Sequence, residues 1–600
     1  MTRALEWATA LLVAALAAAV GLQVVGRHLF HAPLPWTEEI ARLLLVWLMC
    51  IGGIRALHHA EHPRVTVLVR RLAPERRAAV ERGLQLVLLG FFACLVVPAW
   101  RLTVSSAGER LPASGLSGAW MSLVLPIALV AMSVVLVQKL REESRAALPL
   151  GWTLGSAGLV IASVLVPLLM DAAPLAVLVI GFLVTASLGL PLAFTLALTS
   201  ATYLLGIGGV SLTILPIKLL GGVDSFVLLA IPLFILAGAL MESGAISERI
   251  VDLAMALVGR VRGGLAMVVV VAEVLFSGIS GSTAADVSAI SSLLVPSMRR
   301  AGYSAGEAVS VVSAASAMGI LVPPCLTMVV LGSLVNLSIV TLFLGGFLPA
   351  FLLAALLIAL IALRARRQNW PVAERGAHGE LGRAARRAVV PLGLPVLLFG
   401  GIFSGLTTVT EAALIAVVYA LVVGVTAGGI GRGNLLHLLE RSGAVTATTL
   451  WVLAAASAFA WILVREWVPQ SLAEWISGIG ASRALFMTLT VFVFVVIGAL
   501  LEGLPALLIF GPMLFPISRA VGVDPVHYGI VIVAAMGIAF FLPPIGVGLS
   551  IASGIARVDV DEVSRSYLPY LAVLLVGLAL IAAWPGLTLV LPRLLLGYRG

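Results

Sequence analysis

Small hydroxyl residues and a carboxylate stand beside glycines in the middle of a long apolar stretch. The run Gly278-Ile279-Ser280-Gly281-Ser282 is followed directly by Thr283 and, soon after, by Asp286. A helix broken at such a point frees carbonyl oxygens that, together with hydroxyl oxygens, can replace the hydration shell of Na⁺. The N-terminus of the next half-helix also suits an anionic carboxylate. The residue types therefore predict a site for a cation, for an organic acid, or for both.

The same helix breakers recur, with the same spacing, in the second half of the chain. A glycine, a single proline and a proline pair stand at positions 278, 296 and 323–324, and again at positions 498, 516 and 543–544. Helix breakers repeated in register inside apolar sequence predict discontinuous helices in an internally duplicated transporter. Two unwound helices would face the breaks, one containing Gly319 and Pro323, the other Gly537, Pro543 and Gly546. Close helix packing through small residues is the alternative explanation.

Acidic residues inside apolar runs are a second indication of a buried polar site. A charged group at a helix centre costs about 2.5–3.5 kcal/mol on insertion scales, so a cavity or a cation usually accompanies it. Asp286 and Glu411 lie beside breaks rich in serine and threonine, and we expect them to face a cavity in a structural or ion-binding role. Glu273 and Glu502 also lie in apolar runs, but a place near a span end, with the carboxylate reaching the interface, is an alternative for both.

The run from Gly278 to Gly281 also matches the GxSG pattern of rhomboid-type intramembrane serine proteases. Such an enzyme needs a histidine base within hydrogen-bond reach of the serine. All eight histidines of the chain occur in loops or near the ends of apolar runs. A protease is therefore a remote alternative, and we expect no enzyme.

The composition is typical of a polytopic membrane protein. Of the 600 residues, 61% are hydrophobic and 11% are charged, whereas a soluble domain has about 25% charged residues. The net charge of +9 comes mainly from arginines in short loops, where they set membrane topology and do not form a surface for nucleic acid. The chain has no GxxxxGK[ST] motif, so ATP is not the expected driver.

Apolar runs and arginine-rich loops divide the chain into five segments. Seven arginines from Arg55 to Arg82 place the loop between the second and third apolar runs, and with it the N-terminus, in the cytoplasm. We expect a four-helix small unit at 1–145, a joining transmembrane helix at 146–173, the first repeat of a large unit at 174–363, a cytoplasmic linker at 364–388 and the second repeat at 389–600.

Each repeat contains a segment that is too long for one crossing and is interrupted at its middle, at residues 263–298 and 484–518. Arginines flank the first segment on both sides, so it should enter the membrane and turn back as a re-entrant hairpin. The second has weaker positive flanks, so it should open to the other side, as an inverted repeat requires. The predicted fold class is an all-α polytopic membrane protein with a four-helix scaffold unit, a joining helix, inverted repeats, re-entrant hairpins and broken helices.

These segments resemble the membrane subunits of the tripartite ATP-independent periplasmic (TRAP) transporters, here with small and large subunits fused. The resemblance to the large subunit runs through most of 174–600 and includes Asp224-Ser225-Phe226, Thr410-Glu411-Ala412-Ala413 and Pro543-Pro544-Ile545-Gly546. Residues 1–145 are similar to the small subunit, through Trp36-Thr37-Glu38-Glu39.

The resemblance implies Na⁺-coupled import of an organic acid, such as a C4-dicarboxylate, a sugar acid or sialic acid, across a bacterial inner membrane. A periplasmic substrate-binding protein would deliver the acid, and an elevator-type motion would carry it through the lipid bilayer. One Na⁺ site would involve Ser280 and Ser282 with Gly319 to Pro323, and a second the other hairpin with Gly537 to Gly546. The candidate substrate-cavity residues are Ser280, Thr283, Asp286, Glu411 and Glu502.

Two alternatives remain from the sequence. The coupling ion could be a proton, carried by Glu411 or Glu502, and the carrier could work without a binding protein. The second hairpin departs from the family pattern, because Glu502 stands where we expect an aspartate and Pro505 stands where small hydroxyl residues are common.

Overall fold

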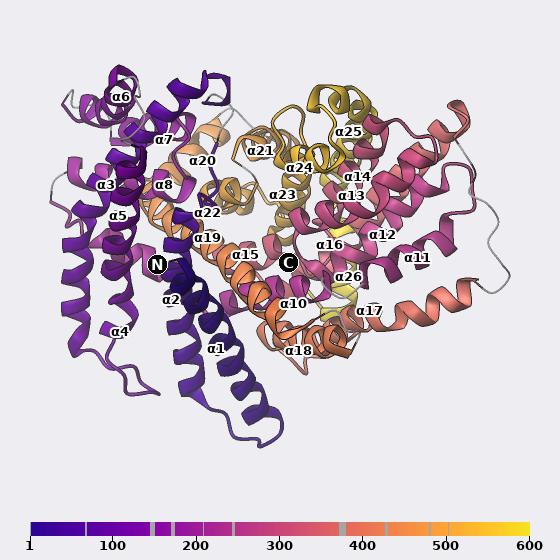
Figure 1. Cartoon of the computed structure of the whole chain (residues 1–600), viewed down its shortest axis with the longest axis horizontal. Coiled ribbons are helices and arrows are strands. Elements are labelled where there is room, and N and C mark those ends of the chain that lie inside the picture. The colour runs from indigo at the N-terminus through magenta and orange to yellow at the C-terminus, as the bar shows by residue number, and fades with distance from the viewer. Residues whose placement is uncertain are drawn as a thin grey trace. The chain divides into compact units, whose positions relative to one another are not determined.

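The computed structural model places the regular secondary structure of the described residues in helices (Figure 1). Ten of these helices are long and apolar enough to cross a membrane, or up to eleven if a bent pair counts as one span. The all-α, multi-pass class predicted from the sequence is thereby confirmed for the part of the chain that the structure describes. That part comprises residues 2–65, 69–143, 150–169, 174–207, 209–242, 246–370, 372, 380–426, 430–478, 482–501 and 503–599.

The chain forms two compact units, which are described separately. Unit 1 comprises Met1–Leu229 and Leu439–Ser471, and unit 2 comprises Ala230–Leu438 and Leu472–Gly600. The helices α19 (Arg432–Arg465) and α20 (Val468–Gly478) each contribute to both units. The other helices of unit 1 are α1 (Thr2–His28), α2 (Pro35–His58), η1 (Val69–Arg71), α3 (Pro74–Ser105), η2 (Ser106–Gly108), α4 (Ala119–Ser122), α5 (Val124–Glu143), α6 (Leu150–Leu169), α7 (Pro174–Ser187), α8 (Leu192–Ile207), α9 (Ile214–Gly221) and η3 (Phe226–Leu229).

In unit 1, α2 packs directly against the α19 segment. A Cβ atom on Gly53 would lie only 2.0 Å from Nε1 of Trp451, so the missing side chain lets a buried indole touch the α2 backbone. Arg55, one turn from the end of α2, forms ion pairs with Glu61 and Glu440. The glycine and the arginine together explain how a helix near the N-terminus is joined to one that comes in the last third of the sequence.

Unit 2 holds the duplicated pattern. Its helices are α10 (Ala230–Glu242), α11 (Ile246–Val258), α12 (Gly264–Ser280), α13 (Thr283–Arg300), α14 (Ala305–Gly319), α15 (Leu326–Val335), α16 (Ile339–Arg367), α17 (Glu380–Phe403), α18 (Val409–Thr426), α21 (Arg483–Leu500), α22 (Leu504–Ala520), α23 (Pro525–Phe540), α24 (Val547–Ala556), α25 (Val560–Ala583) and α26 (Gly586–Leu596). The stretch 364–388, expected as a linker, is helical at its described ends, where it belongs to α16 and α17.

Four consecutive helices, α12 to α15, are repeated as α21 to α24. When the two sets are aligned with Gly278 on Gly498, the starts and ends of all four helix pairs agree to within a single position. The proline pairs lie between α14 and α15 and between α23 and α24, and both Pro-Pro peptide bonds are cis. The duplication predicted from the spacing of glycine and proline is thus present in the backbone.

A glycine shortly after each single proline ends a helix in both copies. Gly302 and Gly522 have φ values of +95° and +77°, a conformation that favours glycine. The following N–H groups bond back into the helix, from Tyr303 to the carbonyl of Met298 at 3.1 Å and from Val523 to that of Ser518 at 2.8 Å. This is a Schellman-type end, and it lets the chain turn sharply from α13 into α14 and from α22 into α23.

The two copies interlock within unit 2. The helix α13 packs against α24, α22 packs against α15, and α14 crosses α23 (labels in Figure 1). The α14–α23 crossing is close at Gly537, where an added Cβ would lie 2.4 Å from the carbonyl oxygen of Ala317. Because each copy rests on the other, the paired and broken helices of unit 2 form one packed body.

We predict that Gly537→Val destabilises the protein more than Gly554→Val. A Cβ at Gly537 collides with backbone, whereas one at Gly554 on α24 meets no atom within 4 Å. Overpacking of this kind costs about 1–3 kcal/mol, and both variants carry the same change in helix propensity. The heat-denaturation midpoint of the purified proteins in detergent measures the difference. Equal midpoints would contradict the close crossing.

Candidate functional site

Four polar side chains gather where α12 ends and α13 begins. Ser277 donates a hydrogen bond to Oδ2 of Asp286 at 2.8 Å, and Ser280 donates to Oδ1 of the same carboxylate. The Ser277 hydroxyl also lies 3.5 Å from Oε1 of Glu273. All four side chains are at most 3% exposed. The predicted residues Ser280 and Asp286 are therefore brought together, with Glu273 beside them.

The backbone at this break shows why the residues take these places. Gly281, with φ of +66°, ends α12, and extended Ser282 precedes the first turn of α13. The Ser282 N–H lies 3.2 Å from the Ser280 hydroxyl oxygen, which it can use as an acceptor. Asp286 lies in the first turn of α13, where the partial positive charge of the helix N-terminus favours a carboxylate. Half-buried Thr283 begins that turn.

The first proline pair faces the break. A Cβ on Gly281 would lie 3.0 Å from the carbonyl oxygen of Pro324, and one on Gly278 would lie 3.6 Å from that of Pro323. The N–H of Leu326, the first residue of α15, lies 3.4 Å from the Gly281 carbonyl oxygen. The break between α12 and α13 and the unwound stretch between α14 and α15 therefore meet, and both contribute oxygen atoms.

Gly319 provides the space that the carboxylates need. An added Cβ there would lie 2.4 Å from Oγ of Ser277 and 2.9 Å from Oε1 of Glu273. Close helix packing, the alternative explanation for the small residues, thus applies at Gly319. Because Gly319 has no side chain, Glu273 and Ser277 can lie against its backbone. The second carboxylate oxygen of Glu273, Oε2, is buried without a hydrogen-bond partner among the described residues.

The chemistry of the cluster is that of hard oxygen ligands. It offers two carboxylates, two hydroxyls and nearby proline carbonyls, the donors that unwound helices present to Na⁺. Within the described ranges no group of three or more His, Cys, Asp or Glu side chains is placed to hold a metal ion. Oxygen ligands of this kind suit a hard cation, whereas histidine and cysteine ligands suit softer transition metals.

The second break has the same backbone but different side chains. In the alignment of the two copies, the positions that correspond to Glu273, Ser277, Ser280 and Asp286 are apolar: Val493, Ile497, Leu500 and Ala506. Gly503, with φ of +79°, starts the turn into α22, and Glu502 lies outside the described residues.

The predicted residues of the second unwound stretch have backbone roles in the structure. Gly537 allows the helix crossing described above, and a Cβ on Gly546 would lie 2.6 Å from the Leu542 nitrogen. The Gly546 N–H bonds to the Leu542 carbonyl at 2.7 Å, so Gly546 closes a tight turn after Pro543. A second ion site in this region stays a prediction.

Glu411 has a local structural role at the start of α18. Its Oε2 accepts a hydrogen bond from the Thr408 N–H at 2.8 Å, and the Thr408 hydroxyl oxygen accepts one from the Glu411 N–H at 3.3 Å. This reciprocal pair is a capping box, and the sequence signature T-x-x-E, here Thr408 to Glu411, is typical of it. The bond from the Thr408 N–H engages one oxygen of the buried carboxylate, so helix capping gives this acidic residue a local role inside an apolar run.

Ser277 is the cluster residue that we did not predict from the sequence. The signal that could have found it is helical spacing, because residues 273, 277 and 280 lie on one face of a helix. The protease alternative gains no support, since Ser280 donates to a carboxylate. Among the described histidines, the ring of His62 bonds to the Gly53 carbonyl and that of His527 to Thr588 and the Ala582 carbonyl.

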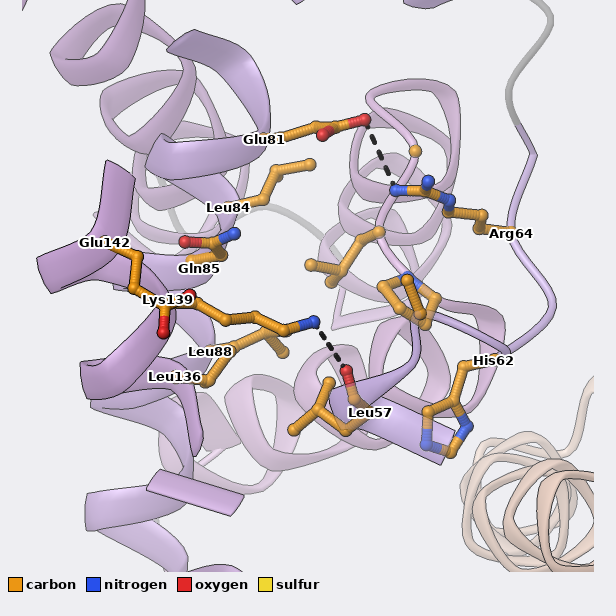
Figure 2. Close-up of a pocket in the computed structure, with 14 residues that line it drawn as sticks. Leu57, His62, Arg64, Glu81, Leu84, Gln85, Leu88, Leu136, Lys139 and Glu142 are labelled. Atoms are coloured by element: carbon orange, nitrogen blue, oxygen red, sulfur yellow. Dashed lines mark hydrogen bonds and ion pairs between the residues drawn. The ribbon is translucent and has the colours of Figure 1, made fainter. Parts of the chain in front are cut away.

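An open cavity of about 360 Å³ in unit 1 contains none of the predicted site residues (Figure 2). Figure 2 shows Arg64 reaching Glu81, at 3.4 Å, and Lys139 reaching the Leu57 carbonyl oxygen, at 2.8 Å. Burial lowers the pKa of His62, which also lines the cavity, to about 4, so its ring is neutral at physiological pH. Because its basic groups already have partners, this cavity is a weaker candidate than the cluster.

Comparisons with known proteins agree with the sequence resemblance. Two protein-family profiles match: "Tripartite ATP-independent periplasmic transporters, DctQ component" over residues 2–146, and the DctM component of the same transporters over residues 179–587. The sialic acid TRAP transporter large permease protein SiaM of Vibrio cholerae is 34% identical over 70% of this chain and 99% of its own length.

Two further relatives match across both parts of the chain. The isethionate TRAP transporter permease protein DctMQ of Oleidesulfovibrio alaskensis is 31% identical over 92% of this chain and 88% of its own length. The sialic acid TRAP transporter permease protein SiaT of Haemophilus influenzae is 27% identical over 98% of each chain.

We predict that Glu411→Gln leaves stability nearly unchanged, whereas Glu411→Ala lowers it. Glutamine keeps an oxygen acceptor for the Thr408 N–H, and alanine removes it at a cost of about 1–3 kcal/mol for a buried unsatisfied donor. Heat denaturation in detergent measures the stability. If the carboxylate charge of Glu411 were needed for ion or substrate binding, both variants would lose uptake alike, which would contradict a purely structural role.

Proposed function

The chain belongs to the TRAP transporters, as a fused small and large membrane subunit, and we propose that it is a secondary active, Na⁺-coupled importer of an organic acid. TRAP permeases work with a periplasmic substrate-binding protein and carry organic acids. We propose such a partner for this chain, a place in the bacterial inner membrane, and a cytoplasmic N-terminus, which the arginines from Arg55 to Arg82 support.

The buried oxygen cluster at the α12–α13 break is the observation that carries the proposal. Two carboxyl groups in contact with one serine, and shielded from water, require a compensating positive charge or a proton. A Na⁺ ion held there by Asp286, Ser277 and Ser280 would supply that charge. Carbonyl oxygens from the facing proline pair lie within reach of the same break, as in sites built from unwound helices.

The same contacts suggest how an ion would be coupled to movement. Asp286 on α13 bonds to serines of α12, and the hairpin tip meets the stretch before α15. A cation bound between them would hold the tip against that stretch. Because the two copies interlock, unit 2 could then move as one body in an elevator-type cycle. A charge moved across 100 mV supplies about 2.3 kcal/mol, enough to drive accumulation of a solute.

The helix terminus beside the proposed ion site supports an acidic substrate. The α13 N-terminus, with Ser282 and Thr283 at its start, offers N–H groups and a partial positive charge to an anionic group. Relatives are named for sialic acid, C4-dicarboxylates and isethionate, all of them acids. We therefore propose an organic acid whose carboxylate approaches this terminus.

Proton coupling is the competing function, and Glu273 is the residue that favours it. Its buried Oε2 has no partner among the described residues, as expected for a carboxyl group that carries a proton. Coupling through Glu411 is less well supported, because its carboxylate oxygen caps α18.

We predict that Ser280→Ala raises the Na⁺ concentration for half-maximal uptake by about tenfold or more. Loss of one hydrogen bond to a charged group is worth about 1.5–3 kcal/mol. Uptake of the acid into proteoliposomes, with the binding protein and an inward Na⁺ gradient, measures the shift. Ser288→Ala is the matched control, because Ser288 lies on α13 but its exposed hydroxyl bonds only to the Ala284 carbonyl.

Two outcomes of the same assay would overturn the proposal. Uptake that persists without Na⁺ and follows a pH gradient would establish proton coupling instead. Uptake at full rate without the binding protein would remove the tripartite assignment and leave an independent carrier.

A further inference from the structure

A large open groove in unit 2 lies outside the ion cluster. Its volume is about 820 Å³, within the range of about 300–1,000 Å³ typical of ligand pockets. Residues of α21, α23, α25 and α26 line it, and none of them belongs to the cluster at the α12–α13 break. Both α21 and α25 are long and apolar enough to span a membrane, so the groove runs beside two candidate membrane spans.

The walls of the groove are apolar. The lining side chains include Met487 and Val491 on α21, Leu575 and Leu578 on α25, and Leu589 on α26. Leu575 remains 39% exposed, and Ala579 and Ala583 are exposed on the same wall. A hydrocarbon chain can cover these surfaces without leaving any polar group unsatisfied.

Two arginines, Arg483 and Arg593, belong to the lining of the groove. Arg483 begins α21, and its Nε donates to the Val521 carbonyl oxygen at 3.3 Å. Arg593 lies in the last turn of α26 and is exposed. Neither guanidinium forms an ion pair with a carboxylate of the described residues. Both are therefore available to a ligand that carries negative charge.

Two other polar residues of the lining, Asp524 and His527, are already engaged within the protein. Asp524 accepts hydrogen bonds from the N–H groups of Val526 and His527 and from the hydroxyl of Tyr598, which lies 3.3 Å away. The ring of His527 bonds to Thr588 and to the Ala582 carbonyl. The lining of the groove carries a net positive charge, because it contains two arginines and one aspartate, Asp524, which caps α23.

We propose that this groove binds an anionic phospholipid from the surrounding bilayer, with an acyl chain along the apolar walls and the phosphate between Arg483 and Arg593. A guanidinium matches phosphate oxygens with paired hydrogen bonds, and basic pockets between membrane helices hold anionic headgroups. Such a lipid bridges α21, the first helix of the second copy, to α25 and α26. This inference goes beyond the transport function and does not depend on the identity of the coupling ion.

Native mass spectrometry of the full-length protein, released from detergent, tests the proposal. Phosphatidylglycerol and phosphatidylcholine with identical chains are titrated in parallel. We expect the wild type to retain one phosphatidylglycerol at least tenfold more tightly than phosphatidylcholine. In Arg483→Ala/Arg593→Ala this preference disappears, whereas Arg383→Ala/Arg386→Ala, which removes two exposed arginines from α17, keeps it.

A second variant tests the apolar wall separately. Ala579→Phe fills the groove from an exposed position and leaves both arginines in place, so retention of either lipid should fall. An unchanged preference in the arginine double variant would overturn the proposal, as would undiminished lipid retention in Ala579→Phe. Glycerol phosphate has no acyl chains. If it were retained as tightly as phosphatidylglycerol, the groove would be a site for soluble anions, and the lipid proposal would be overturned.

Discussion

A carboxylate buried at a helix break is the constraint on which the rest of the candidate site depends. Asp286 is almost wholly removed from water, and an isolated charge in such surroundings is very unfavourable. The protein meets this requirement with two serine donors and with the N-terminus of α13. The break also brings carbonyl oxygens close, and these add acceptors without adding positive charge. Glu273 adds a second carboxyl group against the same serine. A site with this surplus of acceptor oxygens is suited to a small cation.

The two copies show that backbone and chemistry can be duplicated separately. Glycine and proline determine where helices start and stop, so the helix boundaries of the copies agree to within a single position. The polar side chains of the cluster are not repeated, since apolar residues occupy the corresponding places around the second break. A symmetric framework therefore carries different side-chain chemistry at its two breaks. Its second half contributes packing at Gly537 and a tight turn at Gly546, and a second ion site there would rely on backbone oxygens and on Glu502.

Local sequence signals predicted the framework well, because helix ends depend on short-range backbone rules. The proline and glycine spacing located both breaks, and the hydroxyl residues with Asp286 identified the first as the polar one. Contacts between distant segments were beyond such reasoning. Nothing in the sequence near Gly319 shows that its missing side chain makes room for Glu273, or that α13 packs on α24 of the other copy. The capping box of Glu411 with Thr408 is a local feature, and a place for Glu411 at a substrate cavity stays a prediction.

Direct binding of ²²Na⁺ to the purified protein, without substrate or binding protein, tests the central claim most directly. The account predicts saturable binding to the wild type and to Ser288→Ala, and its loss in Glu273→Gln/Asp286→Asn at an unchanged heat-denaturation midpoint. Undiminished binding in that double variant would contradict a Na⁺ site at the α12–α13 break.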